Sequence, residues 1–184
     1  IRMRRWPMDC DRAVVVSGRS GGIPSFFDSA VGGSGSSPTS PLGAGHRKIR
    51  DGEPVLVDLV HVHRGYVSDC TRMFSSGAMS KEWAQRLEDM AQISDLVVSK
   101  LGAGGSCSEA WHEGRSLSAE LGYDHHLMGM PPHQARFLGH SVGLELDESP
   151  VVAGGFDRPM HTGCTMAIEP VSYTHLRAHE TTPH

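Results

Sequence analysis

The segment 55–74 constrains the fold more than any other part of the chain, because it is typical of a β-hairpin that carries two acids, Asp58 and Asp69. If the hairpin turns at residues 63–64, Asp58 stands directly opposite Asp69 with Cβ atoms about 5 Å apart; a three-residue turn or a bulge would shift this pairing by one. Facing carboxylates repel each other, and the surrounding leucines and valines predict partial burial, which strengthens the repulsion. We therefore expect a shared proton, an arginine such as Arg72, or divalent cations to neutralise the pair.

Two later segments carry the side chains that a metal site would still need. GHSVG at 139–143 offers the imidazole of His140 where glycines allow close backbone approach, and Glu169 lies in the apolar stretch MAIEP at 166–170. Each of the four residues, taken alone, has an ordinary structural interpretation: a turn-supporting acid, an arginine partner, a core histidine and a strand-edge charge. The ordered set of Asp, Asp, His and Glu favours a metal site.

At three places the chain resembles the pita-bread metallopeptidases, which include methionine aminopeptidases, Xaa-Pro aminopeptidases and prolidases. The matching residues are GYVSDCTRMF at 65–74, GHSVGL at 139–144 followed by ESP at 148–150, and IEP at 168–170. The resemblance runs from about Val14 to Pro170 and implies an α+β fold in which helices cover a curved antiparallel sheet. It also implies truncation at both ends, with residues 1–170 forming part of the catalytic domain.

The resemblance implies a hydrolase that uses two divalent metal ions as cofactors. Asp58 would chelate one ion, Asp69 would bridge both, and His140 and Glu169 would hold the second, with Glu169 also placed as a catalytic proton shuttle. The ions would be manganese, cobalt, iron or zinc, a choice that ligand type alone does not make. The family has a fifth ligand, a glutamate on a later strand, and no residue of this chain fits it.

The resemblance also implies a substrate, the Xaa-Pro bond of short peptides. His133 resembles a catalytic, substrate-side histidine of proline-specific members, and His46 resembles a substrate-binding histidine that precedes the first ligand strand. Asp147 stands at a substrate-binding position where many of those members have a second histidine. This difference argues against prolidase-like binding of the substrate, and we expect an Xaa-Pro peptidase-like protein of uncharted specificity. Relatives are often dimers, which leaves a homodimer open.

Two other functional classes share this fold. Metal-free, creatinase-like enzymes hydrolyse carbon–nitrogen bonds of small molecules, and non-catalytic members bind peptides, histones or RNA. The first type lacks the carboxylate ligand set and the second tends to lose ligands, whereas this chain keeps every ligand expected before Pro170. The peptidase interpretation is therefore favoured over both.

The end of the chain departs from the pattern. After Pro170 a glycine and a further apolar strand are expected, but the run VSYTHLRAHET at 171–181 looks like the translation of a sequencing adapter. We therefore exclude residues 171–184 from the fold as non-native, and we do not take Glu180 as the missing ligand.

Composition is that of an ordinary enzyme domain. With 184 residues, 38% hydrophobic and 21% charged, the chain can bury one core, and its net charge of -4 gives no basic footprint for nucleic acid. No apolar run approaches membrane-spanning length. The four cysteines lack a Cys-x-x-Cys spacing, which favours reduced thiols and a cytoplasmic location.

The remaining secondary structure is read from periodicity and capping signals. We expect the stretch from Gly18 to Gly45 to be an ordered active-site loop anchored by Ile23, Phe26 and Phe27. The other expected elements are a strand at 13–16, a helix capped by Ser80 and ending at Gly102, a second helix from the capping box Ser106–Glu109 to Gly122, and strands near Leu144 and Met166.

Overall fold

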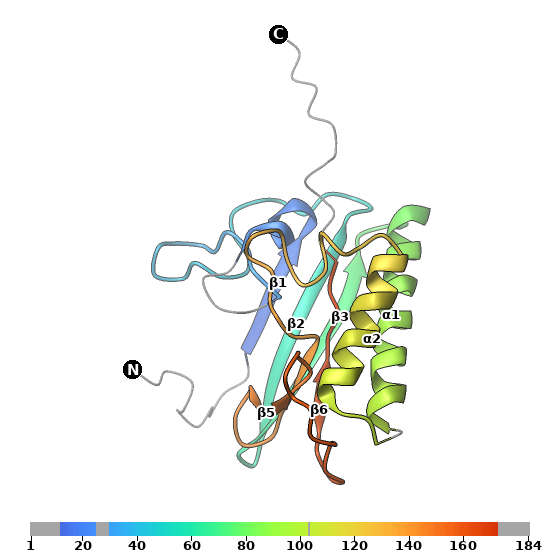
Figure 1. The fold of residues 1–184 in the computed structure, drawn as a ribbon. Helices are drawn as coiled ribbons and strands as arrows, with labels where there is room; N and C mark the ends of the chain where they lie inside the picture. The colour runs from blue at the N-terminus through green and yellow to red at the C-terminus, as the bar shows by residue number, and fades with distance from the viewer. Residues whose placement is uncertain (1–11, 25–29, 103, 173–184) are drawn as a thin grey trace.

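A computed structural model describes residues 12–24, 30–102 and 104–172, which form two antiparallel sheets and a pair of helices (Figure 1). The first sheet has the order β1 (Arg12–Ser17), β2 (Pro54–His63), β3 (Tyr66–Ser75), and the second has the order β5 (Glu148–Val151), β4 (Gly139–Ser141), β6 (Met166–Ile168). The helices are α1 (Lys81–Gly102) and α2 (Cys107–Glu120), and a 3-10 turn, η2 (Gly18–Gly22), follows β1. The first strand, the hairpin and both helices that the sequence predicts are confirmed.

The hairpin turns one residue later than expected. Arg64 and Gly65 have φ angles of 52° and 83°, and these left-handed values at both central positions are those of a type I′ turn. Glycine reaches such a φ without steric cost, whereas a turn at residues 63–64 would require it of His63 and Arg64. The glycine therefore decides where the chain reverses.

This turn moves the pairing of the two acids. Asp58 pairs with Thr71, and Asp69 pairs with Val60. The prediction that Asp58 stands directly opposite Asp69 is therefore wrong: the two acids are diagonal neighbours. A shift of two residues leaves every side chain on its expected face, because side chains alternate with a period of two. The acids thus share a face with Leu56 and Val60, which are 7% and 8% exposed.

Two later strands were expected, one near Leu144 and one near Met166. Leu144 is 67% exposed in the turn between β4 and β5, so the strand expected near it is β4, which ends before Leu144 at Ser141. The strand expected near Met166 is β6. In the glycine-rich stretch, Ile23 is 41% exposed and does not act as an anchor, while Phe26 and Phe27 lie outside the described residues.

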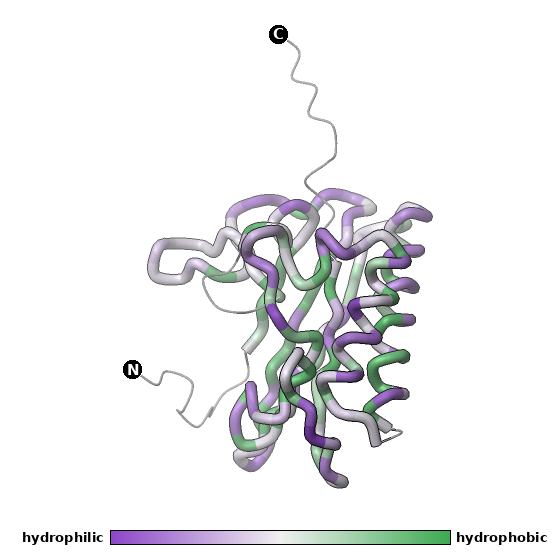
Figure 2. Tube along the Cα trace, viewed as in Figure 1, coloured by the Kyte–Doolittle hydropathy of each residue, from purple (hydrophilic) through white to green (hydrophobic). Residues whose placement is uncertain are grey.

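The larger core lies between the helices and the segments that follow them. Ile93 and Val97 of α1 and Ala110 of α2 are fully buried, and they pack with Leu138 and Val152 from the second half of the chain. Figure 2 shows apolar positions running along the strands and polar ones on the outer surfaces of the helices. Such a one-sided pattern is what a helix packed against a core requires.

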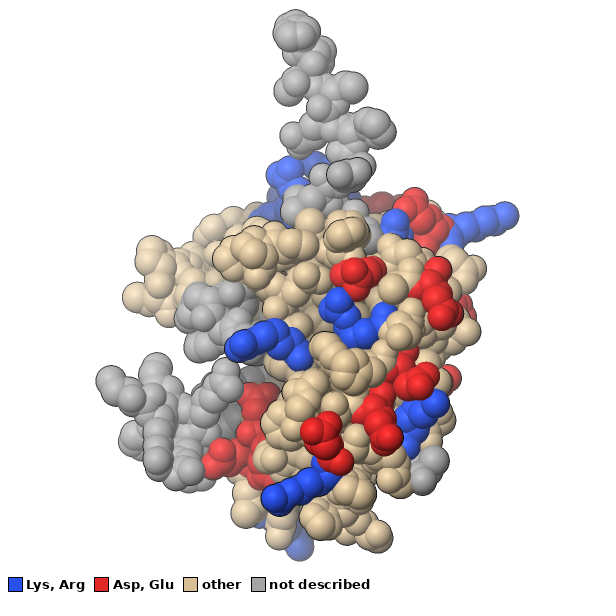
Figure 3. Space-filling model, viewed as in Figure 1, with Lys and Arg blue, Asp and Glu red and all other residues tan. Residues whose placement is uncertain are grey.

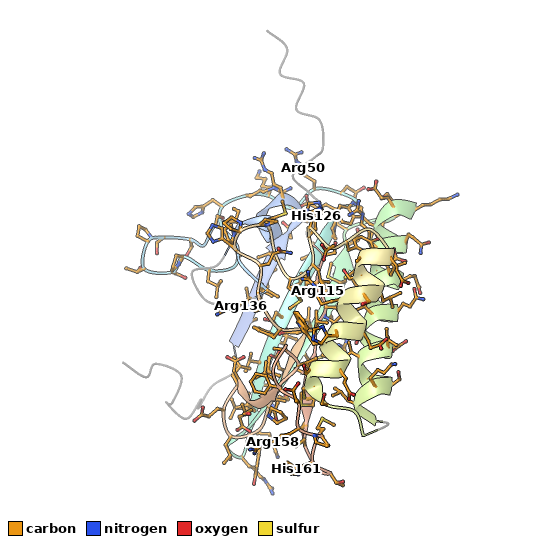
Figure 4. The ribbon with its side chains drawn as sticks, in the orientation of Figure 1. Arg50, Arg115, His126, Arg136, Arg158 and His161 are labelled. Carbon is orange, nitrogen blue, oxygen red and sulfur yellow. The ribbon has the colours of Figure 1, made fainter. Side chains whose placement is uncertain are left out.

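Polar contacts fix the segment that leads from α2 toward β4. The Tyr123 hydroxyl donates to Asp89 Oδ2 at 2.5 Å, and Gln85 Nε2 donates to Asp89 Oδ1 at 2.9 Å. Burial, followed by the hydrogen bond to Asp89, raises the pKa of Tyr123 to about 12, so the hydroxyl stays a donor. Arg115, labelled in Figure 4, adds an ion pair to Asp124 with an N–O distance of 2.6 Å.

The charged surface is mixed. On the face shown in Figure 3, the described acidic and basic side chains are interspersed over the helices and loops. The expectation that the protein binds no nucleic acid stays a prediction. Neither of the described helices combines the length and apolar character that crossing a bilayer demands.

The capping box of α2 gives a direct test of the local fold. Ser106 Oγ accepts from the Glu109 backbone N–H at 3.1 Å, and Glu109 Oε2 accepts from the Ser106 N–H at 2.8 Å. Ser106→Ala should lower the free energy of unfolding by about 1 kcal/mol, because a helix-terminal N–H loses its partner. Urea denaturation measures the change. Ser116→Ala, at an exposed position inside the same helix, is the matched control and should cause no loss, since alanine favours helix. Equal losses in both variants would contradict the capping role.

Candidate metal centre

Three of the predicted ligands converge on one point. Asp69 comes from β3, His140 from β4 and Glu169 from the residue after β6, and their ligand atoms all lie within 4.8 Å of one another. His140 Nε2 lies 3.6 Å from Asp69 Oδ2 and 3.5 Å from Glu169 Oε1. Segments that are distant in sequence therefore deliver two carboxylates and one imidazole to a single site.

Close contact between β4 and β6 brings the imidazole to Glu169. His140 pairs with Ala167, and the Glu169 N–H donates to the Leu138 carbonyl at 2.9 Å. A Cβ atom on Gly139 would lie 2.3 Å from the Ala167 carbonyl oxygen, a distance that no side chain tolerates. The glycine of the Gly-His motif is therefore required for this approach.

A backbone hydrogen bond joins the two sheets beside the site. The Val67 N–H donates to the Gly143 carbonyl at 2.7 Å, so the start of β3 is tied to the turn after β4. Below this contact, Val60, Val67 and Val142 form a small buried cluster. These interactions hold Asp69 against His140 and keep water from one side of the site.

The backbone carbonyl of the next residue, Ser141, sets the orientation of the imidazole. His140 Nδ1 lies 3.1 Å from the Ser141 carbonyl oxygen and donates to it, which leaves Nε2 directed at the carboxylates. The ring is 3% exposed. Burial lowers the pKa of His140, but the hydrogen bond and the charge of Glu169 outweigh it and raise the pKa to about 9. A backbone acceptor on one ring nitrogen is the usual support for a histidine that ligates metal through the other.

The partly buried carboxyl groups of Asp69 and Glu169 bind protons more strongly than isolated acids do. Burial, followed by the charges of Asp58 and Glu169, raises the pKa of Asp69 to about 7. Burial also raises the pKa of Glu169, and His140 opposes that rise. Such a site holds excess negative charge unless protons or cations enter it. Hard carboxylate oxygens with one imidazole are a donor set that fits a divalent cation.

Asp58, the fourth predicted ligand, lies beside this group. Its Oδ1 accepts a hydrogen bond from Thr71 Oγ1 at 2.9 Å, and its charge contributes to the raised pKa of Asp69. It is not one of the three residues whose ligand atoms lie within 4.8 Å of one another. Arg72, an alternative partner of the acids, donates instead to the Thr71 carbonyl at 2.8 Å.

Besides Glu169, the residues predicted to have catalytic or substrate-binding roles are His133, His46 and Asp147, and not all of them lie at the site. Asp147 Oδ1 lies 3.5 Å from His140 Nε2, and its side chain is 39% exposed, against 9% for Asp69. His46 and His133 are exposed on loops and do not belong to the converging group found among the described residues. Only Asp147 is therefore brought to the site.

Thr71 is the site residue to which the sequence analysis gave no role. It lies two positions after Asp69 on a strand, so alternation alone places both side chains on one face. Its hydrogen bond to Asp58 depends on the register, which the sequence analysis predicted with a turn one residue too early.

A cavity of about 650 Å³ borders the carboxylates of Asp69 and Glu169. Its walls include residues 69–73 of β3, one side of α1 and the segment 166–172. Apolar side chains, among them Met73, Trp83 and Met90, contribute much of the lining. The polar site therefore opens onto a mainly apolar space.

Comparisons with known proteins identify the family and the fold. The sequence profile of metallopeptidase family M24 matches residues 10–181. An Xaa-Pro dipeptidase of Lactobacillus delbrueckii subsp. lactis is 26% identical over 155 residues, which cover 84% of this chain and 40% of the dipeptidase. Among solved structures, the X-Pro aminopeptidase of Thermotoga maritima MSB8 aligns with a TM-score of 0.70 at 20% identity, and the prolidase of Pyrococcus horikoshii OT3 with 0.69 at 24%.

Both structural alignments cover 89% of this chain and 40% of the other protein. The chain therefore spans about 40% of the length of the relatives it matches. At these identities the likeness to solved structures shows the fold, and it confirms the α+β, pita-bread expectation.

The pKa shifts predict how stability depends on pH when no metal is bound. Between pH 3.8 and about 7 the folded protein keeps a proton on Asp69 that the unfolded chain has released. Between pH 6.5 and about 9 the same holds for His140. The folded state then binds more protons, so the free energy of unfolding should fall as pH rises from about 4 to about 9. Urea denaturation in a chelator, at a series of pH values, measures this. Asp69→Asn should remove the lower part of the dependence; a stability that rises with pH would contradict the assignment.

Proposed function

The chain belongs to metallopeptidase family M24, and from this premise we propose that the protein hydrolyses peptide bonds with two divalent metal ions. Asp58, Asp69, His140 and Glu169 would hold them. The observation that carries the proposal is the convergence of Asp69, His140 and Glu169 from three segments, with Asp58 alongside. Partly buried acids gathered in this way are costly unless their charge is used.

The proposed chemistry divides among the residues. When bound, the divalent ions would lower the pKa of water and polarise a carbonyl group. Asp69 offers two carboxylate oxygens and can bridge, whereas His140 presents one nitrogen, Nε2. Burial raises the pKa of Glu169, so its carboxyl group holds a proton more readily than a free glutamate does, and it would pass that proton to a leaving amine.

We propose short peptides with an Xaa-Pro bond as the substrate class. The support is the similarity to an Xaa-Pro dipeptidase and to the fold of an X-Pro aminopeptidase and a prolidase. The metal stays manganese, cobalt, iron or zinc. The catalytic role of His133, the substrate contact of His46, a homodimer and a cytoplasmic location also stay predictions.

A fifth ligand would have to come from elsewhere. Among the described residues, no other acid joins Asp69, His140 and Glu169 in a group of three or more. Because the relatives are longer than this chain, we propose that a later strand of the full-length protein supplies a glutamate. Residues 1–170 would then be part of the catalytic domain. Of the segment 171–184, for which we propose an adapter origin, the structure describes Val171 and Ser172, and both contact the fold: the Met128 N–H donates to the Val171 carbonyl at 2.7 Å, and Ser172 forms a bridge with Leu127.

Metal removal tests the function. We expect the full-length protein, stripped with a chelator, to lose hydrolysis of an Xaa-Pro dipeptide and to regain it with manganese. Glu169→Gln keeps the shape of the side chain but cannot carry charge or shuttle a proton, and it should lower kcat by at least about 100-fold. Release of proline measures the rate. Equal rates with and without metal would exclude the metallopeptidase and favour a metal-free hydrolase, and no hydrolysis under any condition would favour a binding protein.

A substitution at Asp147 tests the proposed contact with the amino end of the substrate. Its carboxylate lies on the solvent-exposed side of His140 and can accept a hydrogen bond from the cationic amino end of a peptide. Asp147→Asn should raise KM for a dipeptide with a free amine by about tenfold, with little change in kcat, since a hydrogen bond to a charged group contributes about 1.5 kcal/mol. Steady-state kinetics measure both constants. Manganese affinity is the control, because a matching loss there would make Asp147 a metal ligand instead.

A further inference from the structure

The hydroxyl of Thr71 makes a direct contact with a proposed metal ligand. Thr71 pairs with Asp58 across β2 and β3, and its Oγ1 donates to Asp58 Oδ1 at 2.9 Å. The register produces this contact, because the turn at residues 64–65 places Thr71, rather than Asp69, directly opposite Asp58. The same hairpin that separates the two acids by one diagonal step therefore supplies a donor to the first of them.

Asp58 requires such a donor because of its surroundings. Its charge acts unfavourably on both Asp69 and Glu169, and the repulsion is mutual. A carboxylate on a partly buried strand face can relieve that repulsion by rotating away from its neighbours. The Thr71 hydroxyl opposes the rotation, since it holds Oδ1 of Asp58 in place.

Threonine suits this task better than other hydroxyl residues. Its β-branched side chain has few χ1 rotamers, and it is favoured in strands. The hydroxyl therefore has a fixed direction before any ligand arrives. A partner that orients a ligand in this way changes metal affinity without touching the metal.

We propose that Thr71 is a positioning residue that presents Asp58 to the first metal ion. This inference rests on the proposed metal centre and adds a residue to it. The competing explanation is an ordinary cross-strand pair that stabilises the sheet, and it predicts a loss of stability without a specific loss of metal affinity.

The test compares variants of the full-length protein that differ in one hydroxyl group. Thr71→Val keeps the shape and removes the donor, whereas Thr71→Ser keeps the donor. Ser68→Ala is the matched control, because Ser68 is on the same strand and its hydroxyl contacts the His61 carbonyl at 3.4 Å instead of an acid. Calorimetric titration with manganese gives the affinity, and the thermal midpoint in a chelator gives the metal-free stability.

We expect Thr71→Val to weaken manganese binding by about 10- to 100-fold, Thr71→Ser to stay within a few-fold of the wild type, and Ser68→Ala to match it. Wild-type affinity in Thr71→Val would overturn the inference, and so would an equal loss in Thr71→Ser. A fall in metal-free thermal midpoint alone would assign Thr71 to sheet stability. If the wild type itself binds no manganese, the metal centre fails together with the inference; normal wild-type binding with an unaffected Thr71→Val overturns the inference alone.

Discussion

Repulsion among carboxylates gathered around one imidazole is the constraint on which this structure depends. Asp69, Glu169 and Asp147 each place an oxygen 3.5 to 3.6 Å from His140 Nε2. The backbone enforces this arrangement, through the contact of β4 with β6 at Gly139 and through the hydrogen bond between the two sheets at Val67. In the absence of cations the site compensates by binding protons, which is why the pKa values of Asp69, His140 and Glu169 rise together. Like charges held together in this way lower the stability of the fold when no cation is bound, so stability alone does not explain their convergence.

The sequence predicted the elements and the identity of the converging residues, but not their exact pairing. Periodicity and caps sufficed for β1, the hairpin and both helices, because each of these signals is local. The hairpin register depended on which residue could adopt a positive φ, and Gly65 settled it one position later than expected. The face of each acid survived this error because a shift of two residues preserves alternation. Convergence with His140 and Glu169 followed from the resemblance, since no local signal reports a contact across seventy residues or more.

Two residues show what sequence patterns leave out. Thr71 belongs to the hairpin motif, yet its contact with Asp58 appears only once the register is known. Asp147 was identified by its departure from a histidine, and the structure adds its distance to His140 and its exposure. Its neighbour Glu148 has a different role, because Glu148 Oε1 accepts from the Glu145 N–H at 2.7 Å and closes the turn. Adjacent acids of similar chemistry are thus separated into one that shapes the loop and one that faces the site.

The cavity beside the carboxylates of Asp69 and Glu169 is lined by residues of both sheets. Among the described strands, β3 lies at an edge of the first sheet and β6 at an edge of the second, and residues of both line the cavity. An unpaired strand edge offers backbone donors and acceptors that a further strand can satisfy. A strand placed there would lie next to Asp69 and Glu169, where one acidic side chain would complete the proposed ligand set. The edges that leave the sheets open would then also bring in the last ligand, so closing the fold and completing the metal site would be a single event.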